Sequence, residues 1–213
     1  MFFFLKQYLS ALHKTKVRLR SMDDAINLLK TTLHNFHKLT DKEFKEFLKI
    51  SEYKTLAKKE FLLQNGQYNH GILFVTKGIL GLYELINTKE IYTSFFSVSN
   101  FATEISSLAS QNTSNKNIVA ISNTEGFFIK RTELLQLYDK SISFERLGRK
   151  LLEHLLSEQH TFTTMLTSLK PEDRYKYLLE HNPELIQQIP IQYLASYIGI
   201  ARETLSRIRR RML

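Results

Sequence analysis

The spacing of apolar residues at the C-terminal end predicts two short helices joined by a tight turn. Residues 189–213 read IPIQYLASYIGIARETLSRIRRRML, with Pro190 suited to a helix's first position and Gly199 to the positive φ that ends one. The second helix is expected over 201–212, where one face carries Leu205, Ile208 and Met212. The opposite face carries Arg202, Glu203, Ser206 and Arg207. Such a helix packs by one side and leaves a polar edge that can enter a DNA major groove.

The middle of the chain has a different pattern, which is typical of β-strands. Between residues 53 and 130, short apolar runs such as 72–75 and 79–83 alternate with turn residues. We interpret three glycines in this region as turns, namely Gly66, Gly78 and Gly126. Several strands at regular spacing favour a sandwich, a barrel or a roll.

Residues 144–169 carry an apolar seam with helical spacing, which predicts one long helix. The seam consists of Phe144, Leu147, Leu151, Leu155, Phe162, Met165 and Leu169, widened by Leu152, Leu156 and Leu166. A helix of about 28 residues is about 42 Å long, more than one small domain needs. Two packing partners are possible for this helix, a parallel second copy of it or the strands of the same chain. Both can apply at once if each partner packs on a different face of the helix. We expect Leu151 and Leu155 to lie at the interface of a homodimer.

The segment before the strands is expected to form two helices. One begins near Ala25, capped by Asp23 and Asp24, and the other begins after a capping box made by Thr40 and Glu43. The apolar side chains expected to face the core are Phe44, Phe47 and Leu48.

Residues 1–21 hold five basic and no acidic side chains. Their apolar run is too short for a signal-peptide core, and the charges follow it rather than precede it. We interpret 1–21 as a basic N-terminal extension that the fold does not need, with Met22 as an alternative start. The other interpretation is an amphipathic helix that touches a membrane or an acidic partner.

Charge and composition limit the classes of function that the chain can have. The 213-residue chain has a net charge of +9, and its last twelve residues contain five arginines and one glutamate. A basic end indicates a polyanionic partner there. The chain has no cysteine, which excludes disulfides and thiolate chemistry. No apolar run approaches the length of a membrane span.

No residue pattern predicts an enzyme or a metal site. We find neither a nucleophile with its base nor a glycine-rich phosphate loop. His34 and His37 are three residues apart, but no further ligands complete a metal site around them. We therefore expect no catalytic residue, no metal and no cofactor.

The sequence ARETLSRI resembles the recognition helix of the cyclic-AMP receptor protein and fumarate-nitrate regulator (Crp/Fnr) family. The family motif is Arg-Glu-Thr with a further Arg three residues after Thr, present here as Arg202, Glu203, Thr204 and Arg207. The preceding YLASYIG also agrees, including Gly199. The resemblance implies an α+β fold with a cyclic-nucleotide-binding-like β-roll sensor, a long dimerisation helix and a C-terminal helix-turn-helix domain.

The resemblance also suggests domain boundaries. After the extension 1–21, the β-roll sensor domain is expected over 22–140, the dimerisation helix over 141–169 and the helix-turn-helix domain over 170–213. Relatives often continue into a β-hairpin wing, whereas no wing is evident here after the recognition helix.

Roles for individual side chains follow from the same resemblance. The residues expected to read bases are Arg202, Glu203, Ser206 and Arg207. Those expected to contact the DNA backbone are Gln192, Thr204, Arg209 and Arg210, while Arg211 serves the backbone or solvent. Relatives with the same Arg-Glu-Arg set read a TGTGA-like half-site, and the resemblance implies something similar here.

The sensor segment departs from the family's ligand signature. Members that bind cyclic nucleotides carry Gly-Glu and, ten residues after the Glu, Arg-Ser. Here Thr103 precedes Glu104, Ser114 and Asn115 replace Arg-Ser, and Lys116 is displaced and lacks the fork of arginine. Because a buried phosphate without a paired cation is costly, we expect cyclic AMP and cyclic GMP to bind no better than millimolar. For an unknown effector, the polar groups of the pocket are expected to be Glu104 and Lys116.

These observations predict a cytoplasmic, homodimeric transcription regulator that reads an inverted repeat in double-stranded DNA. Its expected partners are DNA, a second copy of the chain, RNA polymerase and an unidentified small-molecule effector, with no membrane. The alternative is a small-molecule sensor or protein-interaction scaffold whose DNA-binding end is degenerate.

Overall fold

The computed structural model describes residues 21–212, so the predicted extension lies outside the described residues except for Ser21. Helix α2 (Met22–Phe36) begins where Ser21, in an extended conformation, accepts a hydrogen bond on its Oγ from the Asp24 backbone N at 3.2 Å. The expectation that Asp23 and Asp24 cap a helix near Ala25 is therefore wrong, because both lie in the first turn. Ser21 belongs to the folded part as the N-cap.

Helix α3 (Asp41–Lys49) begins with the predicted capping box, which is confirmed. The Glu43 N–H donates to Thr40 Oγ1 at 3.2 Å, and the Thr40 N–H donates to Glu43 Oε2 at 2.8 Å. The side chains of Phe44 and Phe47 are buried, as their spacing predicted.

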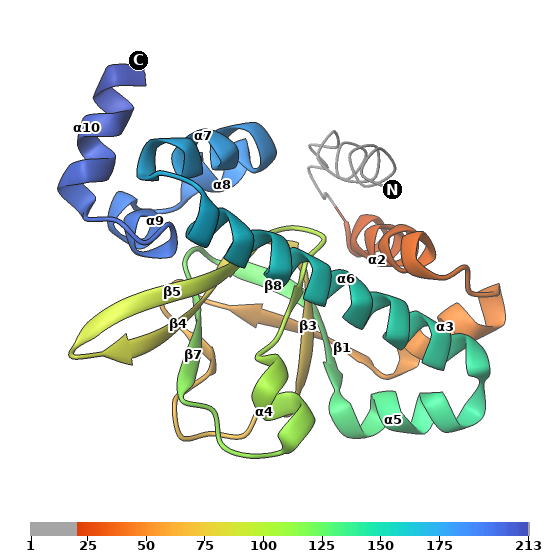
Figure 1. Cartoon of the computed structure of the whole chain (residues 1–213). Coiled ribbons are helices and arrows are strands. Elements are labelled where there is room, and N and C mark those ends of the chain that lie inside the picture. Colours follow the sequence, from red (N-terminus) through yellow and green to blue (C-terminus); the bar gives the residue numbers. More distant parts are fainter. Residues whose placement is uncertain (1–20, 213) are drawn as a thin grey trace.

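Within residues 21–212, eight strands form two four-stranded sheets that face each other. The strands are β1 (Ser51–Leu56), β2 (Phe61–Leu63), β3 (Gly71–Lys77), β4 (Leu80–Ile86), β5 (Lys89–Phe96), β6 (Phe101–Ala102), β7 (Lys116–Ala120) and β8 (Thr124–Lys130). The sheet orders are β1-β8-β3-β6 and β2-β7-β4-β5, so β5 lies at an edge. The short helix α4 (Ile105–Ser110) follows β6. This is the predicted roll, seen below the long helix in Figure 1.

Two of the three glycines interpreted as turns are turns, and the third is not. Gly66 and Gly78 have φ of +85° and +86°. Gly126 instead lies inside β8, paired with Lys54 of β1 and Val75 of β3. A Cβ at Gly126 would run into the carbonyl oxygen of Phe74, so the glycine allows two strands to approach closely.

Three apolar clusters account for most of the buried side chains. The cluster between the sheets consists of Leu56, Leu63, Leu73, Val75, Leu80, Leu82, Ala102, Ile118 and Ala120. Side chains on the other face of the first sheet, including Phe74 and Phe127, pack with the N-terminal helices and α6. Side chains of β4, β5 and the loop after β7 share a third cluster with the C-terminal helices.

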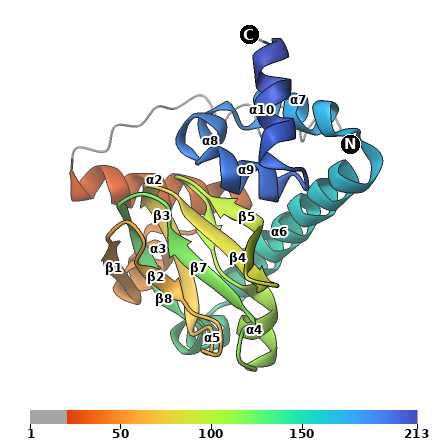
Figure 2. The same ribbon diagram turned by 90° about the vertical axis from the view of Figure 1, so that its left-hand side faces the viewer.

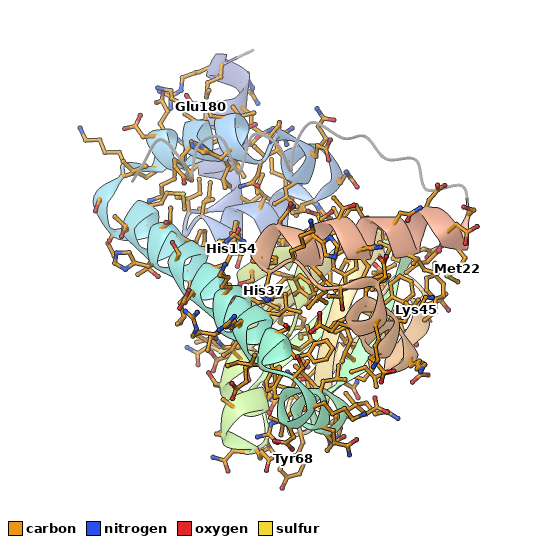
Figure 3. The ribbon with its side chains drawn as sticks, turned by 90° about the vertical axis from the view of Figure 1, so that its right-hand side faces the viewer. Met22, His37, Lys45, Tyr68, His154 and Glu180 are labelled. Atoms are coloured by element: carbon orange, nitrogen blue, oxygen red, sulfur yellow. The ribbon has the colours of Figure 1, made fainter. Side chains whose placement is uncertain are left out.

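Helix α6 (Ile142–Ser168) follows α5 (Arg131–Lys140) and crosses the roll as one 27-residue helix, as Figure 1 shows. The Phe36 ring of α2 lies 5.2 Å from the ring of His154 at the crossing of these helices, where Figure 3 also shows His37. The N-terminal half of the apolar seam faces its own chain, because Phe144 and Leu147 are buried in the cluster with α2.

The expectation that Leu151 and Leu155 lie at a homodimer interface stays a prediction, and both side chains already lose part of their exposure within their own chain. Leu151 packs, partly buried, against the chain's own N-terminal cluster, and Leu155 is also partly buried. The apolar side chains that α6 leaves in solvent are Leu152, 46% exposed, and Leu156, 57% exposed. Helical periodicity located the seam but could not say which edge of it the roll covers.

The C-terminal region is helical. It consists of α7 (Pro171–His181), α8 (Pro183–Gln188), α9 (Ile191–Tyr197) and α10 (Arg202–Met212). Pro190 is the N-cap of α9 rather than its first residue, and Gly199 has the predicted positive φ of +67°. Met212 was expected on the packed face of the last helix but is 38% exposed, because the packed face ends at Ile208.

Candidate DNA-binding surface

The packing of α10 decides which of its side chains are free. Leu205 and Ile208 are buried in one cluster with Tyr175 and Leu178 of α7 and Leu194 of α9. This anchors one side of α10 and leaves the other side in solvent.

The side chains predicted to read bases lie mostly on that solvent side. Arg202, Glu203 and Arg207 are exposed, whereas Ser206 is partly buried. The Arg207 Nε donates to the Glu203 carbonyl oxygen at 3.4 Å, a long contact that leaves the rest of the guanidinium available. Two cations and one carboxylate therefore lie on the exposed side of the first two turns.

The side chains predicted to contact the DNA backbone are more scattered. A shallow hollow on α10 is lined by Thr204, Arg207, Arg210 and Arg211. The structure thus places Arg211 in the hollow, while Arg209 is partly buried and does not line it. Arg207 and Arg211 are four residues apart, which places both on the same side of the helix, and this spacing is the sequence signal for their common place in the hollow. Gln192 is exposed in the first turn of α9.

Helix α9 is bound to the edge strand β5 of the roll, a contact that sequence reasoning missed. The Ser196 Oγ accepts from the Tyr92 backbone N–H at 3.0 Å and donates to the Glu90 carbonyl oxygen at 2.9 Å. The ring of Tyr193 lies 4.6 Å from that of Tyr92. Burial, and next the nearby Glu90 carboxylate, raise the pKa of Tyr92. Figure 2 shows α9 beside β5.

A second aromatic contact ties the same helix to α6. The ring of Tyr197 stacks on Phe162 with centroids 4.2 Å apart and meets Phe95 of β5 edge-on at 5.1 Å. Burial, and next the charge of Glu158, raise the pKa of Tyr197. The helix-turn-helix region, the edge strand β5 and the long helix therefore form one packed unit.

In the β-roll, Glu104 serves as the N-cap of α4. Its carboxylate accepts hydrogen bonds from the backbone N–H groups of Ser106, at 3.1 Å, and Ser107, at 2.7 Å, and the residue is 4% exposed. Thr103, in the place of the signature glycine, donates to the Gly71 carbonyl oxygen at 3.2 Å. The backbone donors at the start of α4 thus already hold a carboxylate of the chain itself.

The residues in place of the Arg-Ser signature are also engaged. The Ser114 Oγ accepts from the Lys116 N–H at 3.0 Å, and the Asn115 Nδ2 donates to Glu84 Oε1 at 2.6 Å. Lys116 itself is partly buried at the start of β7 and pairs in register with Glu84. None of the ion pairs recorded for residues 21–212 joins Lys116 to Glu104.

Two kinds of site are absent from the part of the chain that the structure describes. Within residues 21–212, no group of three or more His, Asp and Glu side chains could hold a metal ion. Over the same residues, no helix combines the length and the hydrophobicity that crossing a bilayer requires.

Comparison with known proteins agrees with this architecture. The cyclic nucleotide-binding domain family matches residues 53–141, which include β2 to β8. No curated protein sequence matches the chain significantly.

Solved structures resemble the chain over most of its length. FixK2 from Bradyrhizobium japonicum has a TM-score of 0.67 at 17% identity, covering 76% of this chain and 84% of that one. A Crp/Fnr-family transcriptional regulator from Eubacterium rectale has a TM-score of 0.62 at 17% identity, covering 81% and 82%. The Thermus thermophilus catabolite activator protein has a TM-score of 0.53 at 21% identity, covering 85% and 86%.

At these identities the likeness establishes the fold. The α+β arrangement of a cyclic nucleotide-binding β-roll, a long helix and a C-terminal helical region is confirmed. The chain thus has the fold of solved Crp/Fnr-family regulators, as its recognition-helix motif predicted.

Proposed function

We propose that the chain is a homodimeric regulator that binds an inverted repeat in double-stranded DNA and reads bases with α10. The observation that carries the proposal is the division of α10 into a buried side, held by Leu205 and Ile208, and an exposed side with Arg202, Glu203 and Arg207. A helix anchored in this way can enter the major groove without losing its packing.

The chemistry of the exposed side suggests which bases are read. A guanidinium donates two hydrogen bonds to guanine O6 and N7, so Arg202 and Arg207 would each select a G. Glu203 can only accept, so it would select the amino group of a cytosine. A carboxylate also repels phosphates, which argues against a helix that merely clamps the DNA backbone.

Other side chains would hold the helix on the DNA without reading sequence. Thr204, Arg210 and Arg211 line the hollow beside Arg207, where a phosphate could lie. Gln192 is exposed near the start of the helix-turn-helix, and Arg209 keeps part of its surface in solvent. Ser206, partly buried beside the base-reading arginines, could contribute a shorter contact.

A second copy of the chain would pack along α6. Leu152 and Leu156 are exposed four residues apart on one side of this helix, and Ile142, 60% exposed, precedes them. A twofold pair of such helices would present two copies of α10 to inverted half-sites about 34 Å apart. A regulator bound in this way would act on transcription through RNA polymerase.

The sensor domain would not respond to cyclic nucleotides. The donors that start α4 hold the Glu104 carboxylate, and the only cation in the replaced signature, Lys116, is displaced. A cyclic nucleotide would have to share these backbone donors with the Glu104 carboxylate and would leave its own phosphate without a forked partner. Calorimetry with cyclic AMP and cyclic GMP should show no binding tighter than millimolar, and a micromolar constant would contradict this part of the proposal.

The experiment for DNA reading is a selection from random duplexes with the wild type and three alanine variants. Arg202→Ala and Arg207→Ala should each weaken binding to the preferred site by about 1–3 kcal/mol and relax the choice of one base. Arg210→Ala should weaken binding to all sequences alike and make affinity less dependent on salt.

Two results would contradict the proposal. An unchanged selected motif in both Arg202→Ala and Arg207→Ala would show that α10 does not read bases. Failure of the wild type to bind any duplex at low salt would instead favour a sensor or scaffold that acts through protein contacts.

A further inference from the structure

Arg174, on α7, joins the ends of two other helices. Its Nε donates to the Leu169 carbonyl oxygen at 2.9 Å, and its Nη1 donates to the Ile198 carbonyl oxygen at 2.9 Å. Leu169 is the C-cap of α6, and Ile198 is the C-cap of α9. One guanidinium therefore connects the long helix to the turn that precedes α10.

The two hydrogen bonds of the Arg174 guanidinium suit a rigid connection, or clamp, between the two helix ends. The carbonyl groups at a helix C-terminus have no partners within the helix and carry partial negative charge. A guanidinium supplies a positive charge and several donors in a fixed planar fork, so it can serve two such ends in one geometry. Gly199 has a φ of +67°, and a Cβ at this position would lie 3.3 Å from Arg174 Nη1. Because glycine has no Cβ, the turn leaves room for the guanidinium.

The clamp spans the joint between the dimer helix and the helix-turn-helix. Only Leu169 and Lys170 separate the end of α6 from Pro171, the first residue of α7. Two residues of extended backbone can rotate, so the chain connection alone would leave the orientation of α10 relative to α6 loosely defined. Arg174 contacts both sides of this joint.

We propose that Arg174 is a positioning residue that sets the spacing between the two half-sites. This inference rests on the proposed function, because α6 holds the two copies together and α10 reads each half-site. One added base pair moves a half-site by about 3.4 Å along the DNA axis and also rotates it. The stack of Tyr197 on Phe162 also joins α9 to α6, so loss of Arg174 loosens this joint without freeing it, and the pair of recognition helices then tolerates a wider range of spacers.

The test uses the full chain and duplexes built from the half-site selected by the wild type. The spacer between inverted half-sites is varied by single base pairs, and one further duplex keeps a single half-site beside random sequence. The wild type should prefer one spacer by about tenfold or more over its neighbours, and Arg174→Gln should reduce this preference to about threefold or less. Its affinity for the single half-site should change by less than about twofold.

Lys176→Gln is the matched control. Lys176 is on the same helix and pairs at the surface with Glu172 and Asp173, whereas the bonds to the two helix ends come from Arg174. The spacer preference of the Lys176→Gln variant should therefore equal that of the wild type. Should Arg174→Gln fail to fold, Arg174→Lys takes its place, since it keeps the charge without the fork.

The outcomes separate this inference from the proposed function. An unchanged spacer preference in the Arg174 variant would overturn the positioning role and leave DNA reading intact. An equal loss of affinity on every duplex, the single half-site included, would also overturn it, because Arg174 would then only stabilise the helix-turn-helix. Absence of any sequence preference in the wild type would overturn the proposed function itself.

Discussion

The hydroxyl group of Ser196 accepts a hydrogen bond from the backbone N–H of Tyr92 at 3.0 Å, although the two residues are 104 positions apart. Tyr92 belongs to β5, an edge strand of its sheet. An edge strand has backbone groups that no neighbouring strand pairs. The Ser196 side chain, on α9, pairs with two such backbone groups of β5, because it also donates to the carbonyl oxygen of Glu90.

Replacing Ser196 should therefore weaken the attachment of α9 to β5. Ser196→Ala leaves the Tyr92 N–H and the Glu90 carbonyl oxygen without this partner, and it should lower the free energy of unfolding by about 1 kcal/mol. Urea denaturation followed by circular dichroism measures the change. Ser157→Ala, at an exposed position of α6, is the control and should be neutral. Equal stability of both variants would show that the hydroxyl adds nothing to the attachment.

The exposed leucines of α6 should decide the oligomeric state. Changing both Leu152 and Leu156 to glutamate places charges in the proposed interface, so sedimentation should show a monomer of 25.1 kDa and specific DNA binding should be lost. Ser157→Glu on another side of the helix should remain dimeric. Leu151→Ala should lower stability, by about 2 kcal/mol, without dissociating the dimer, because Leu151 packs within its own chain. A dimer that survives both glutamates would place the interface elsewhere.

Gly126 should tolerate no side chain. Gly126→Ala puts a methyl group against the carbonyl oxygen of Phe74 in the neighbouring strand, and the backbone must separate to admit it. We expect a loss of about 2 kcal/mol or more in thermal or urea unfolding. Gly66→Ala meets no atom within 4 Å, so it should cost only the strain of its positive φ, about 1 kcal/mol. Similar losses in the two variants would argue against the close approach of β3 and β8.

Stability should fall in acid partly through Glu43. Hydrogen bonds, first from the Thr40 backbone N–H and then from nearby hydroxyl groups, lower the pKa of Glu43 from 4.5 to about 2. A lowered pKa in the folded state means that the contribution is complete above pH 4.5 and is lost as the pH falls towards 2. Glu43→Gln should melt at a lower temperature than the wild type at pH 6.

The difference in melting temperature between Glu43→Gln and the wild type should shrink between pH 4.5 and 2. Glu46→Gln, on the same helix, is the control. The pKa of Glu46 is also lowered, first by the hydrogen bond from Lys49, but this ion pair lies at the surface, so the difference for Glu46→Gln should be much smaller. A difference that stays constant with pH would mean that the charge of Glu43 does not stabilise the folded state.

Local backbone chemistry was readable from the sequence alone. The capping box of Thr40 and Glu43 and the positive φ of Gly199 each depend on a few neighbouring residues, and the structure has both. The motif around Arg202 also predicted the Crp/Fnr-like fold, because a recognition helix needs apolar anchors and polar groups at fixed helical spacing.

Contacts between distant parts of the chain were decided only by the tertiary structure. Periodicity shows that α6 has apolar sides, but the packing of Leu151 against α2 and the exposure of Leu152 depend on which side the roll covers. Gly126 looks like a turn residue until β3 is seen against it. The bond between Ser196 and Tyr92 has no local signal, because a serine hydroxyl can pair with any nearby backbone group, and only the folded chain brings that group within reach.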